Sequence, residues 1–446
     1  MDIRKYLWPS SFDSKIVVIN IFLVANAVVW YASILRALET NLGAVGEQSW
    51  LAPNSQILIW GIHFAGLVLS AFVGAKIARK INRTRFLTFW MTLNVALSLT
   101  LFGLNYTNFI ITIALVSLYG VSFGLGMPIC MSNYSDTLPV ENRGRTSGLI
   151  MLISGVGIFA FAAAPLNFFE IGIALSIWRL SSLVIFLAVR SPLEVDVKKG
   201  NPSFKNVVSQ RSFLAYFVPW VLFSFVNFLV PLQPVAGYEP SNDILLIQTV
   251  FLGIFSVLGG FLLDSIGRKR IAISGFIMLG LAAAARGIDS TGILSSYFSA
   301  VFEGAAWGLL LVLFILTLWG DLSDVLPSVK YYAVGATPFF ISMFIGLTFS
   351  NQIESSLPAT SLFPFAAFFL FIAVLPLFYA TETLPEVITK GRDIKSYTEK
   401  ALKKAQEEAK KGLLKTEKET DKDKENNQEE NGKEYEEARK LAEKYY

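Results

Sequence analysis

The sequence predicts an all-α membrane protein with twelve transmembrane helices in two pseudo-symmetric six-helix bundles and a charged cytoplasmic C-terminal tail. Three observations predict this fold. Of the 446 residues, 53% are hydrophobic, which is more than soluble domains usually contain. Of the 72 charged side chains, 32 lie in residues 385–446, so the remainder of the chain is poor in charge. Lys and Arg also recur in every second loop between the apolar segments.

Apolar segments long enough to span a bilayer recur along residues 1–384. A helix of roughly 20 apolar residues crosses the ~30 Å hydrocarbon layer. The sequence predicts twelve of them: Ile16–Leu38, Ser55–Ala78, Phe86–Leu104, Phe109–Met131, Ser147–Leu166, Ile171–Val189, Phe213–Val235, Ile244–Leu263, Ile271–Ala285, Ile293–Trp319, Tyr331–Ser350 and Phe363–Ala380.

The basic residues of the short loops set the orientation. The 2–3, 4–5, 6–7 and 8–9 connections carry Lys and Arg, whereas residues 39–54, 105–108, 167–170, 236–243 and 351–362 contain neither. Basic loops stay on the cytoplasmic side of a membrane. We therefore expect a multi-pass protein of the cell membrane with both termini in the cytoplasm.

Residues 1–189 and 213–384 form the two predicted bundles, with a cytoplasmic linker at 190–212 and a partly helical or disordered tail at 385–446. The halves repeat. Gly120xxxGly124 recurs as Gly304xxxGly308 after 184 residues, and Ser135-Asp136-Thr137-Leu138-Pro139 recurs as Ser323-Asp324-Val325-Leu326-Pro327 after 188. Gly74 and Gly260 are 186 residues apart. Repeated halves of this kind are typical of secondary transporters.

Several kinds of chemistry are disfavoured by composition. One cysteine and one histidine exclude a Cys-rich metal site and HExxH zinc chemistry, and no GxxxxGK[ST] sequence is present to hold nucleotide phosphates. The net charge of +4 does not indicate nucleic-acid binding. We expect no cofactor, no metal and no enzymatic activity.

Two loops carry a family resemblance. Residues 260–270, GFLLDSIGRKR, resemble the signature loop G-x-x-x-D-x-x-G-R-[KR] of the major facilitator superfamily, and ENRGRTSG at 141–148 is similar to its E-x-R-G-R stretch. ETLPE at 382–386 is a looser echo of its P-E-T segment. The resemblance covers residues 1 to about 390. It implies transport of a small molecule by alternating access.

The first-half copy of the signature loop departs from the family pattern. In residues 74–83 the acidic position is Ala78 and the second glycine is Ile81. A gate at the cytoplasmic ends is nevertheless expected, with Asp264 accepting hydrogen bonds from Arg268 or from a neighbouring helix start. The predicted gate residues are Gly260, Asp264, Gly267, Arg268, Lys269, Glu141, Arg143 and Arg145.

Polar side chains at membrane depth are the candidates for substrate or proton contact, because an ionisable group there is costly. Glu303 is the clearest: it lies ten residues into its predicted helix, ~15 Å deep, beside small residues. A carboxylate in such a place can carry a proton. The candidate set for proton coupling or substrate contact is Glu303, His63, Asn26, Tyr119, Asn227 and Trp307. For Arg179 we expect a structural partner on another helix.

The sequence thus predicts a monomeric secondary transporter in the lipid bilayer that moves a small organic solute, a sugar or an organic acid, with possible proton coupling as a symporter. The alternative is a non-transporting receptor or scaffold that acts through its cytoplasmic tail. A third reading pairs His63 with Ser122 of the GxSxG sequence at 120–124 in an intramembrane protease. It is disfavoured because that motif needs a strand-to-helix turn, whereas here it lies inside a predicted span.

Overall fold

The computed structural model describes residues 14–47, 55–101, 109–189, 202–229, 242–290, 292–323, 327–356, 359–385, 402, 431–441 and 443. The regular secondary structure of these residues is helical. The chain forms two compact units, Met1–Leu384 and Pro385–Tyr446. In the second unit, residues 431–441 form a helix whose side chains are exposed.

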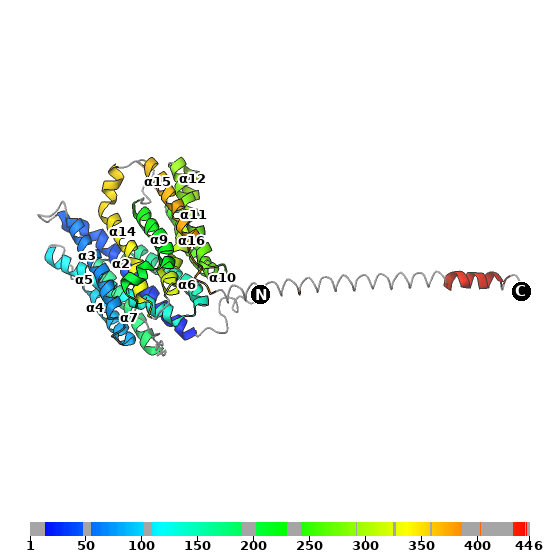
Figure 1. The fold of residues 1–446 in the computed structure, drawn as a ribbon, viewed down its shortest axis with the longest axis horizontal. Helices are drawn as coiled ribbons and strands as arrows, with labels where there is room; N and C mark the ends of the chain where they lie inside the picture. Colours follow the sequence, from blue (N-terminus) through cyan, green and yellow to red (C-terminus); the bar gives the residue numbers. More distant parts are fainter. Residues whose placement is uncertain are drawn as a thin grey trace. The chain divides into compact units, whose positions relative to one another are not determined.

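Figure 1 labels most of the helices of the first unit. In chain order the helices are α2 (Ser14–Glu47), α3 (Ser55–Ile77), α4 (Arg83–Leu99), α5 (Phe109–Thr137), α6 (Val140–Ala163), α7 (Phe168–Ala188), α8 (Phe204–Ser209), α9 (Arg211–Leu229), α10 (Asn242–Ser265), α11 (Arg268–Ile288), α12 (Ile293–Leu311), η2 (Val312–Thr317), α13 (Leu318–Asp321), α14 (Val329–Ser356), α15 (Ala359–Ile372) and α16 (Val374–Tyr379).

Ten helical stretches in the described part of the chain are long and apolar enough to cross a membrane, and each coincides with a predicted span. The third and seventh predicted spans correspond to the shorter helices α4 and α9. The last residues of those two predicted spans, 102–104 and 230–235, lie outside the described residues. The described residues therefore form an all-helical, multi-pass membrane protein, and the full count of twelve spans stays a prediction.

Several helices extend beyond the predicted boundaries, among them α2, which continues to Glu47, and two further differences have a visible cause or consequence. Residues expected in the 4–5 loop belong to α6, which begins at Val140 instead of Ser147. The first turns of α6 are stabilised from outside because the Asp264 carboxylate accepts the Gly144 and Arg145 amide protons, at 2.9 Å each. The tenth predicted span is interrupted by a wide π-helical turn, η2, where the Thr317 hydroxyl donates to the Val312 carbonyl at 2.9 Å.

The two sequence halves gather on different sides of the first unit. Figure 1 shows α3, α4, α5 and α7 on one side, and α10, α11, α12 and α15 on the other. Extensive contacts join α3 to α5 and α4 to α7 in the first half, and α10 to α12 and α11 to α15 in the second. Between the halves, α6 packs on α10 and α14 packs on α3. The predicted division into two six-helix bundles at 1–189 and 213–384 agrees with this arrangement but stays a prediction.

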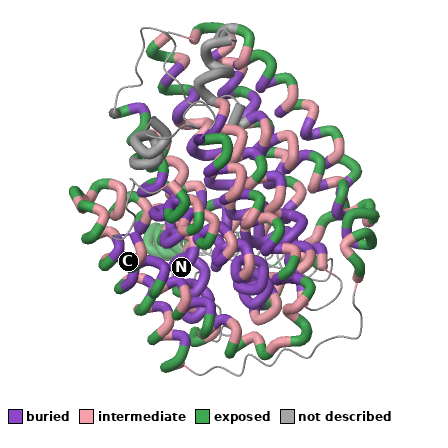
Figure 2. The backbone as a smooth tube through the Cα atoms, turned by 90° about the vertical axis from the view of Figure 1, so that its left-hand side faces the viewer, coloured by how far each residue is buried: buried purple, intermediate pink, exposed green. Residues whose placement is uncertain are grey.

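The glycine repeat makes the same contact in both halves. A Cβ on Gly120 or Gly124 of α5 would collide with the His63 or Leu67 carbonyl of α3. A Cβ on Gly304 or Gly308 of α12 would collide with backbone of α10, at Gln248 and Leu252. Only residues without a side chain allow helices to approach so closely. Figure 2 shows the result, with buried segments where helices meet and exposed residues on the outward turns.

Candidate functional site

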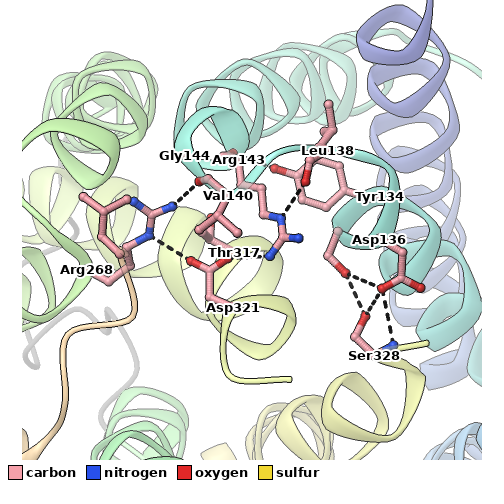
Figure 3. Close-up of polar contacts among 12 residues, drawn as sticks. Tyr134, Asp136, Leu138, Val140, Arg143, Gly144, Arg268, Thr317, Asp321 and Ser328 are labelled. Carbon is pink, nitrogen blue, oxygen red and sulfur yellow. Dashed lines mark hydrogen bonds and ion pairs between the residues drawn. The ribbon is translucent and has the colours of Figure 1, made fainter. Parts of the chain in front are cut away.

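The ends of the helices that carry residues 74–85, 132–145, 260–270, 317–323 and 327–330 lie together, and we call this region the basic end. Its central acid is Asp321, at the end of α13, whose carboxylate is fully buried. One oxygen accepts from Arg143 Nη1 at 2.7 Å and the other from Arg268 Nε at 2.8 Å. Figure 3 shows the two arginines approaching Asp321 from opposite sides. Arg143 belongs to the first half, so this cluster joins the halves.

The guanidinium of Arg268 is fully buried and has further partners. Its Nη1 donates to the Leu263 carbonyl at 2.7 Å, and its Nη2 donates to the Val140 carbonyl of α6 at 2.6 Å. Arg143 in turn donates from Nε to the Leu138 carbonyl at 3.0 Å. Charge-assisted bonds of this kind are among the stronger polar contacts in proteins. The two arginines therefore hold α6 against the end of α13 and the start of α11.

Asp136, at the end of α5, is the counterpart of Asp321 in the first half. It accepts from Arg83 Nη2 at 2.7 Å and from the Ser328 hydroxyl at 2.8 Å, so it also contacts the opposite half (Figure 3). The pairs Asp136 and Asp321, Arg83 and Arg268, and Arg143 and Ser328 are each 185 residues apart. The basic end thus contains two equivalent clusters, one around Asp136 and one around Asp321, at corresponding positions of the two halves. In the first-half copy a serine hydroxyl takes the place of an arginine.

Asp264 makes both kinds of contact expected for it. Its carboxylate is buried, receives the two amide protons of α6 described above, and lies 3.3 Å from Arg268 Nη2. Helix N-termini favour negative charge, so the carboxylate stabilises the start of α6. Gly144 and Gly260 allow the approach: a Cβ on Gly144 would lie 2.5 Å from the Gly260 carbonyl oxygen and 2.6 Å from Asp264 Oδ1.

Glu382, beyond the last helix of the first unit, caps the start of α11. Its carboxylate accepts from the Arg268 amide at 2.8 Å and the Lys269 amide at 3.1 Å. Gly267 precedes them at a φ of 112°, a left-handed conformation that favours glycine, and any side chain there would meet the Glu382 carboxylate. Lys269 Nζ donates to the Phe378 carbonyl at 2.8 Å.

The remaining predicted gate residues lie at the edge of this region. Arg145 Nε is 3.9 Å from Asp264, and its guanidinium lies over the Phe261 ring at 5.0 Å. Glu141 lies half-buried in the first turn of α6.

Four charged residues that form the ion pairs and the helix cap described above were not among the predicted site residues. They are Arg83, Asp136, Asp321 and Glu382. The SDxLP repeat pairs Asp136 with Asp324, which lies outside the described residues, and so conceals its relation to Asp321. Aligning the halves at an offset of 185, the spacing of Arg83 and Arg268, would have found it.

Glu303 lies half-buried on α12, away from the basic end. Its carboxylate accepts a long hydrogen bond, 3.3 Å, from Gln248 Nε2 of α10. The Arg286 guanidinium, at the end of α11, lies near enough to act on it electrostatically. Trp307, one turn further along α12, is also half-buried and meets the Phe223 ring of α9 edge-on, with the centroids 5.1 Å apart. The Glu303 carboxylate and the Trp307 ring of α12 therefore lie together with the Gln248 amide of α10 and the Phe223 ring of α9.

Other residues predicted to contact the substrate are instead hydrogen-bonded to neighbouring helices. The Tyr119 hydroxyl is 2.8 Å from Thr100 Oγ1. Asn26 is buried, donates to the Trp178 carbonyl at 2.5 Å, and accepts from Arg179 Nη1 at 3.0 Å. Arg179 therefore has the interhelical partner expected for it, and its guanidinium also lies 4.4 Å from the Trp90 ring. Asn227 lies in α9, but its side chain is outside the described residues.

His63 is buried on α3 with both ring nitrogens bonded. Nε2 is 2.9 Å from the Tyr31 hydroxyl, and Nδ1 is 2.8 Å from the Val116 carbonyl oxygen. Because a carbonyl only accepts, Nδ1 carries the proton and Nε2 accepts from Tyr31. Ser122 donates to Asn94 Oδ1 at 2.6 Å instead of approaching His63. This geometry opposes a Ser–His catalytic pair and favours a packing role for the histidine.

Replacing His63 by leucine should therefore lower stability. The Tyr31 hydroxyl and the Val116 carbonyl would lose their buried partner, at a cost of about 1–3 kcal/mol in the free energy of unfolding. Unfolding of the detergent-solubilised protein measures the change. The matched control is Thr92→Val, because Thr92 is exposed and its hydroxyl donates to the Thr88 carbonyl of its own helix. Wild-type stability in His63→Leu, together with an altered pH profile of transport, would contradict the packing role.

These features define a class: a helical, multi-pass membrane protein whose sequence halves repeat and are joined at one end by buried ion pairs. The model of the Major Facilitator Superfamily matches residues 17–314. The chain therefore belongs to the major facilitator superfamily of membrane transporters. These proteins lie in the lipid bilayer and bind small-molecule substrates.

Solved structures share the fold. The human organic anion transporter MFSD10 (TETRAN) aligns with a TM-score of 0.63 and 13% sequence identity, covering 81% of this chain and 99% of that one. The proton:xylose symporter XylE, bound to 6-bromo-6-deoxy-D-glucose, aligns with a TM-score of 0.66 and 14% identity, covering 84% and 97%. A search of curated protein sequences finds no match. At these identities the likeness establishes the fold alone.

Proposed function

We propose that this protein is a secondary transporter of the cell membrane that moves a small organic solute by alternating access, coupled to protons through Glu303. The observation that carries the proposal is the cluster at the basic end, in which Arg143 of the first half and Arg268 of the second share Asp321. Both termini and the basic end are placed in the cytoplasm by this proposal. The structure is then the state in which the cytoplasmic side is closed.

The contacts between the halves suit a reversible gate. Buried ion pairs gain little net energy over their solvated parts, because desolvation of the charges offsets much of their attraction. A cluster of this kind can therefore form in one state and separate when water enters in another. Asp264 and the α6 amide groups, and Asp136 with Ser328, would separate together with Asp321 and Arg143.

The surroundings of Glu303 support proton coupling. Gln248 offers one long hydrogen bond, and the Arg286 guanidinium lies near enough to attract the carboxylate. Protonation would remove that attraction and leave a neutral donor beside α10. A substrate that binds differently to these two forms would be coupled to the proton.

The substrate class is a sugar or an organic acid. The half-buried Trp307 ring offers a face for a sugar, and the Arg286 cation offers a counter-charge for an acid. The printed descriptions of the two solved relatives, a xylose symporter and an organic anion transporter, support these two classes without choosing between them. Thermal-shift screening of both classes identifies the substrate, since a ligand at a hundred times its Kd adds about 2.7 kcal/mol.

Glu303→Gln tests the coupling. In proteoliposomes containing the identified substrate, this variant should lose accumulation driven by a pH gradient while retaining exchange of labelled for unlabelled substrate. Glu170→Gln is the matched control, because Glu170 is exposed and glutamine can keep the capping box it forms with Asn167. Unchanged proton-driven accumulation in Glu303→Gln would contradict the role of Glu303.

A further inference from the structure

The first half contains a buried cation, Arg179, that the proposed transport cycle does not use. It lies near the middle of α7, about 14–17 Å along the helix from either end, and its side chain is fully buried. Its Nη1 donates to Asn26 Oδ1, as described above. Its Nε and Nη2, which carry further N–H donors, have no hydrogen-bond partner among the described residues. A charge at this depth in a membrane is costly, so it needs a partner.

The acids of the described part of the first half lie elsewhere. They are Glu39, Glu47, Asp136, Glu141 and Glu170. Glu170 caps the start of α7, about 14 Å along the helix from Arg179. Asp136 is paired with Arg83, and Glu141 belongs to the first turn of α6, both at the basic end. Glu39 and Glu47 are at least about 20 Å beyond Asn26 along α2. None of these carboxylates lies at the depth of Arg179.

Two serines of α7 define how this helix lies against α4. The Ser176 hydroxyl donates to the Val95 carbonyl at 3.2 Å, and the Ser182 hydroxyl donates to Met91 Sδ at 3.6 Å. Arg179 lies between these serines in the sequence of α7. It therefore meets α4 at the level of residues 91–95.

Asn94 supplies a second donor without a partner at this level. It is fully buried and follows Trp90 by one turn of α4, and the Trp90 ring lies 4.4 Å from the guanidinium carbon of Arg179. Asn94 Oδ1 accepts from the Ser122 hydroxyl at 2.6 Å, whereas its Nδ2 has no hydrogen-bond partner in the described part of the chain. The unpartnered nitrogen atoms of Arg179 and Asn94 are all donors.

A set of donors alone favours an anion over water. A water molecule accepts hydrogen bonds but also brings two protons that need acceptors of their own. An anion accepts from every donor and also supplies a counter-charge. The Trp90 and Trp30 rings, 4.4 and 5.9 Å from the guanidinium carbon, attract the cation but do not neutralise it. The Cys130 thiol acts on Arg179 electrostatically, but a buried thiol is protonated at neutral pH and carries no charge.

We propose that Arg179 and Asn94 bind a small monovalent anion, of the size of chloride, between α4 and α7. The anion accepts from Nε and Nη2 of Arg179 and from Nδ2 of Asn94, and it neutralises the cation. A compact anion is required because the neighbouring Trp90 and Trp30 side chains are fully buried and leave no room for a large one. Binding stabilises the packing of α7 on α2 and α4. The inference concerns binding within the first half, whereas the proposed coupling residue, Glu303, belongs to α12.

Replacement of one anion by another tests the site without a transport assay. The purified full-length protein is exchanged into sodium gluconate, and chloride then replaces gluconate at constant sodium concentration while thermal unfolding is followed. Gluconate is too large for a site among buried side chains. We expect a saturable rise in the unfolding temperature with chloride, and no rise in Arg179→Gln, which lacks the cation. An unfolding temperature of the wild type that stays the same throughout the titration would overturn the proposal.

Asn94→Asp provides an independent test. Aspartate keeps the acceptor for Ser122 and places a carboxylate oxygen where Nδ2 was, so the chain itself supplies the counter-charge. This variant should unfold at a higher temperature than the wild type in gluconate and should not respond to chloride. The matched control is Asn82→Asp, because Asn82 is the exposed N-cap of the same helix and aspartate caps a helix as well as asparagine does. It should keep the wild-type response.

A further control separates this site from a general effect of chloride. Arg36 is an exposed cation of α2 in the same half, so Arg36→Gln should respond as the wild type does. A full chloride response in Arg179→Gln would contradict the site. An Asn94→Asp variant that is less stable than the wild type in gluconate would also contradict it, and this comparison decides the matter if Arg179→Gln does not fold. No transport is measured, so these outcomes do not bear on the proposed function.

Discussion

Asp321→Ala is expected to lower the free energy of unfolding by about 3–5 kcal/mol. The variant leaves two buried guanidinium groups, those of Arg143 and Arg268, without the carboxylate that they share. An unpaired buried charge costs more than the pair contributes, because the desolvation of the remaining ion is no longer compensated. Chemical unfolding of the protein in detergent, read by tryptophan fluorescence, measures the loss.

The structure offers a matched control in an exposed ion pair. Arg439 and Glu443 are 3.5 Å apart in the tail, with side chains 74% and 69% exposed. Removing one partner of an exposed pair changes stability little, because water solvates the other. Glu443→Ala should therefore unfold as the wild type does. Equal stabilities of Asp321→Ala and Glu443→Ala would contradict the structural role assigned to the Asp321 cluster.

Gly260→Ala is the second substitution with a large expected effect. The added methyl group would collide with the Gly144 carbonyl and lie 3.0 Å from the Gly148 Cα, both in the backbone of α6. Backbone atoms cannot move aside as a side chain does, so α6 and α10 must separate. Overpacking of this kind costs about 1–3 kcal/mol. Separation also lengthens the hydrogen bonds from the Gly144 and Arg145 amide groups to the Asp264 carboxylate. The state with a closed basic end should therefore lose population.

Gly155→Ala is the control for the glycine substitution. Gly155 lies in α6, and among the described residues no atom beyond its own stretch of helix lies within 4 Å of the position that its Cβ would take. Alanine is favoured over glycine in a helix by up to about 1 kcal/mol, so this variant should keep or raise the unfolding temperature. If Gly260→Ala were as stable as Gly155→Ala, the close packing of α6 on α10 would not be required.

The helices could be predicted because hydrophobic length and loop charge act locally. Ten predicted spans coincide with membrane-length helices, and the Gly120 and Gly304 repeats make matching helix contacts. The start of α6 could not be predicted from its own segment. Residues 141–148 are polar and carry two arginines, and they become helical where a carboxylate of α10 meets their amide groups.

The candidate site could be predicted only in part, because a sequence motif is local whereas most partners in the site are distant along the chain. The motif at 260–270 identified Asp264 and Arg268, whereas their neighbours depend on tertiary contacts. Asp321 lies outside the motif and becomes central because the ends of α6 and α11 converge on it. Glu382 caps α11 from 114 residues away along the chain. His63 attracted attention as the single histidine, but only the structure shows its bonds to Tyr31 and Val116.

The central claim is that the Asp321 cluster holds the basic end closed in one of two states. Spin labels at Thr84 and Arg270, exposed positions that begin α4 and α11, report the distance across this end by double electron–electron resonance. Cys130, the single native cysteine, is buried and does not compete for the label. We predict one short distance in the wild type and a second, longer one in Asp321→Asn. A folded Asp321→Asn variant that keeps the single short distance would contradict the claim.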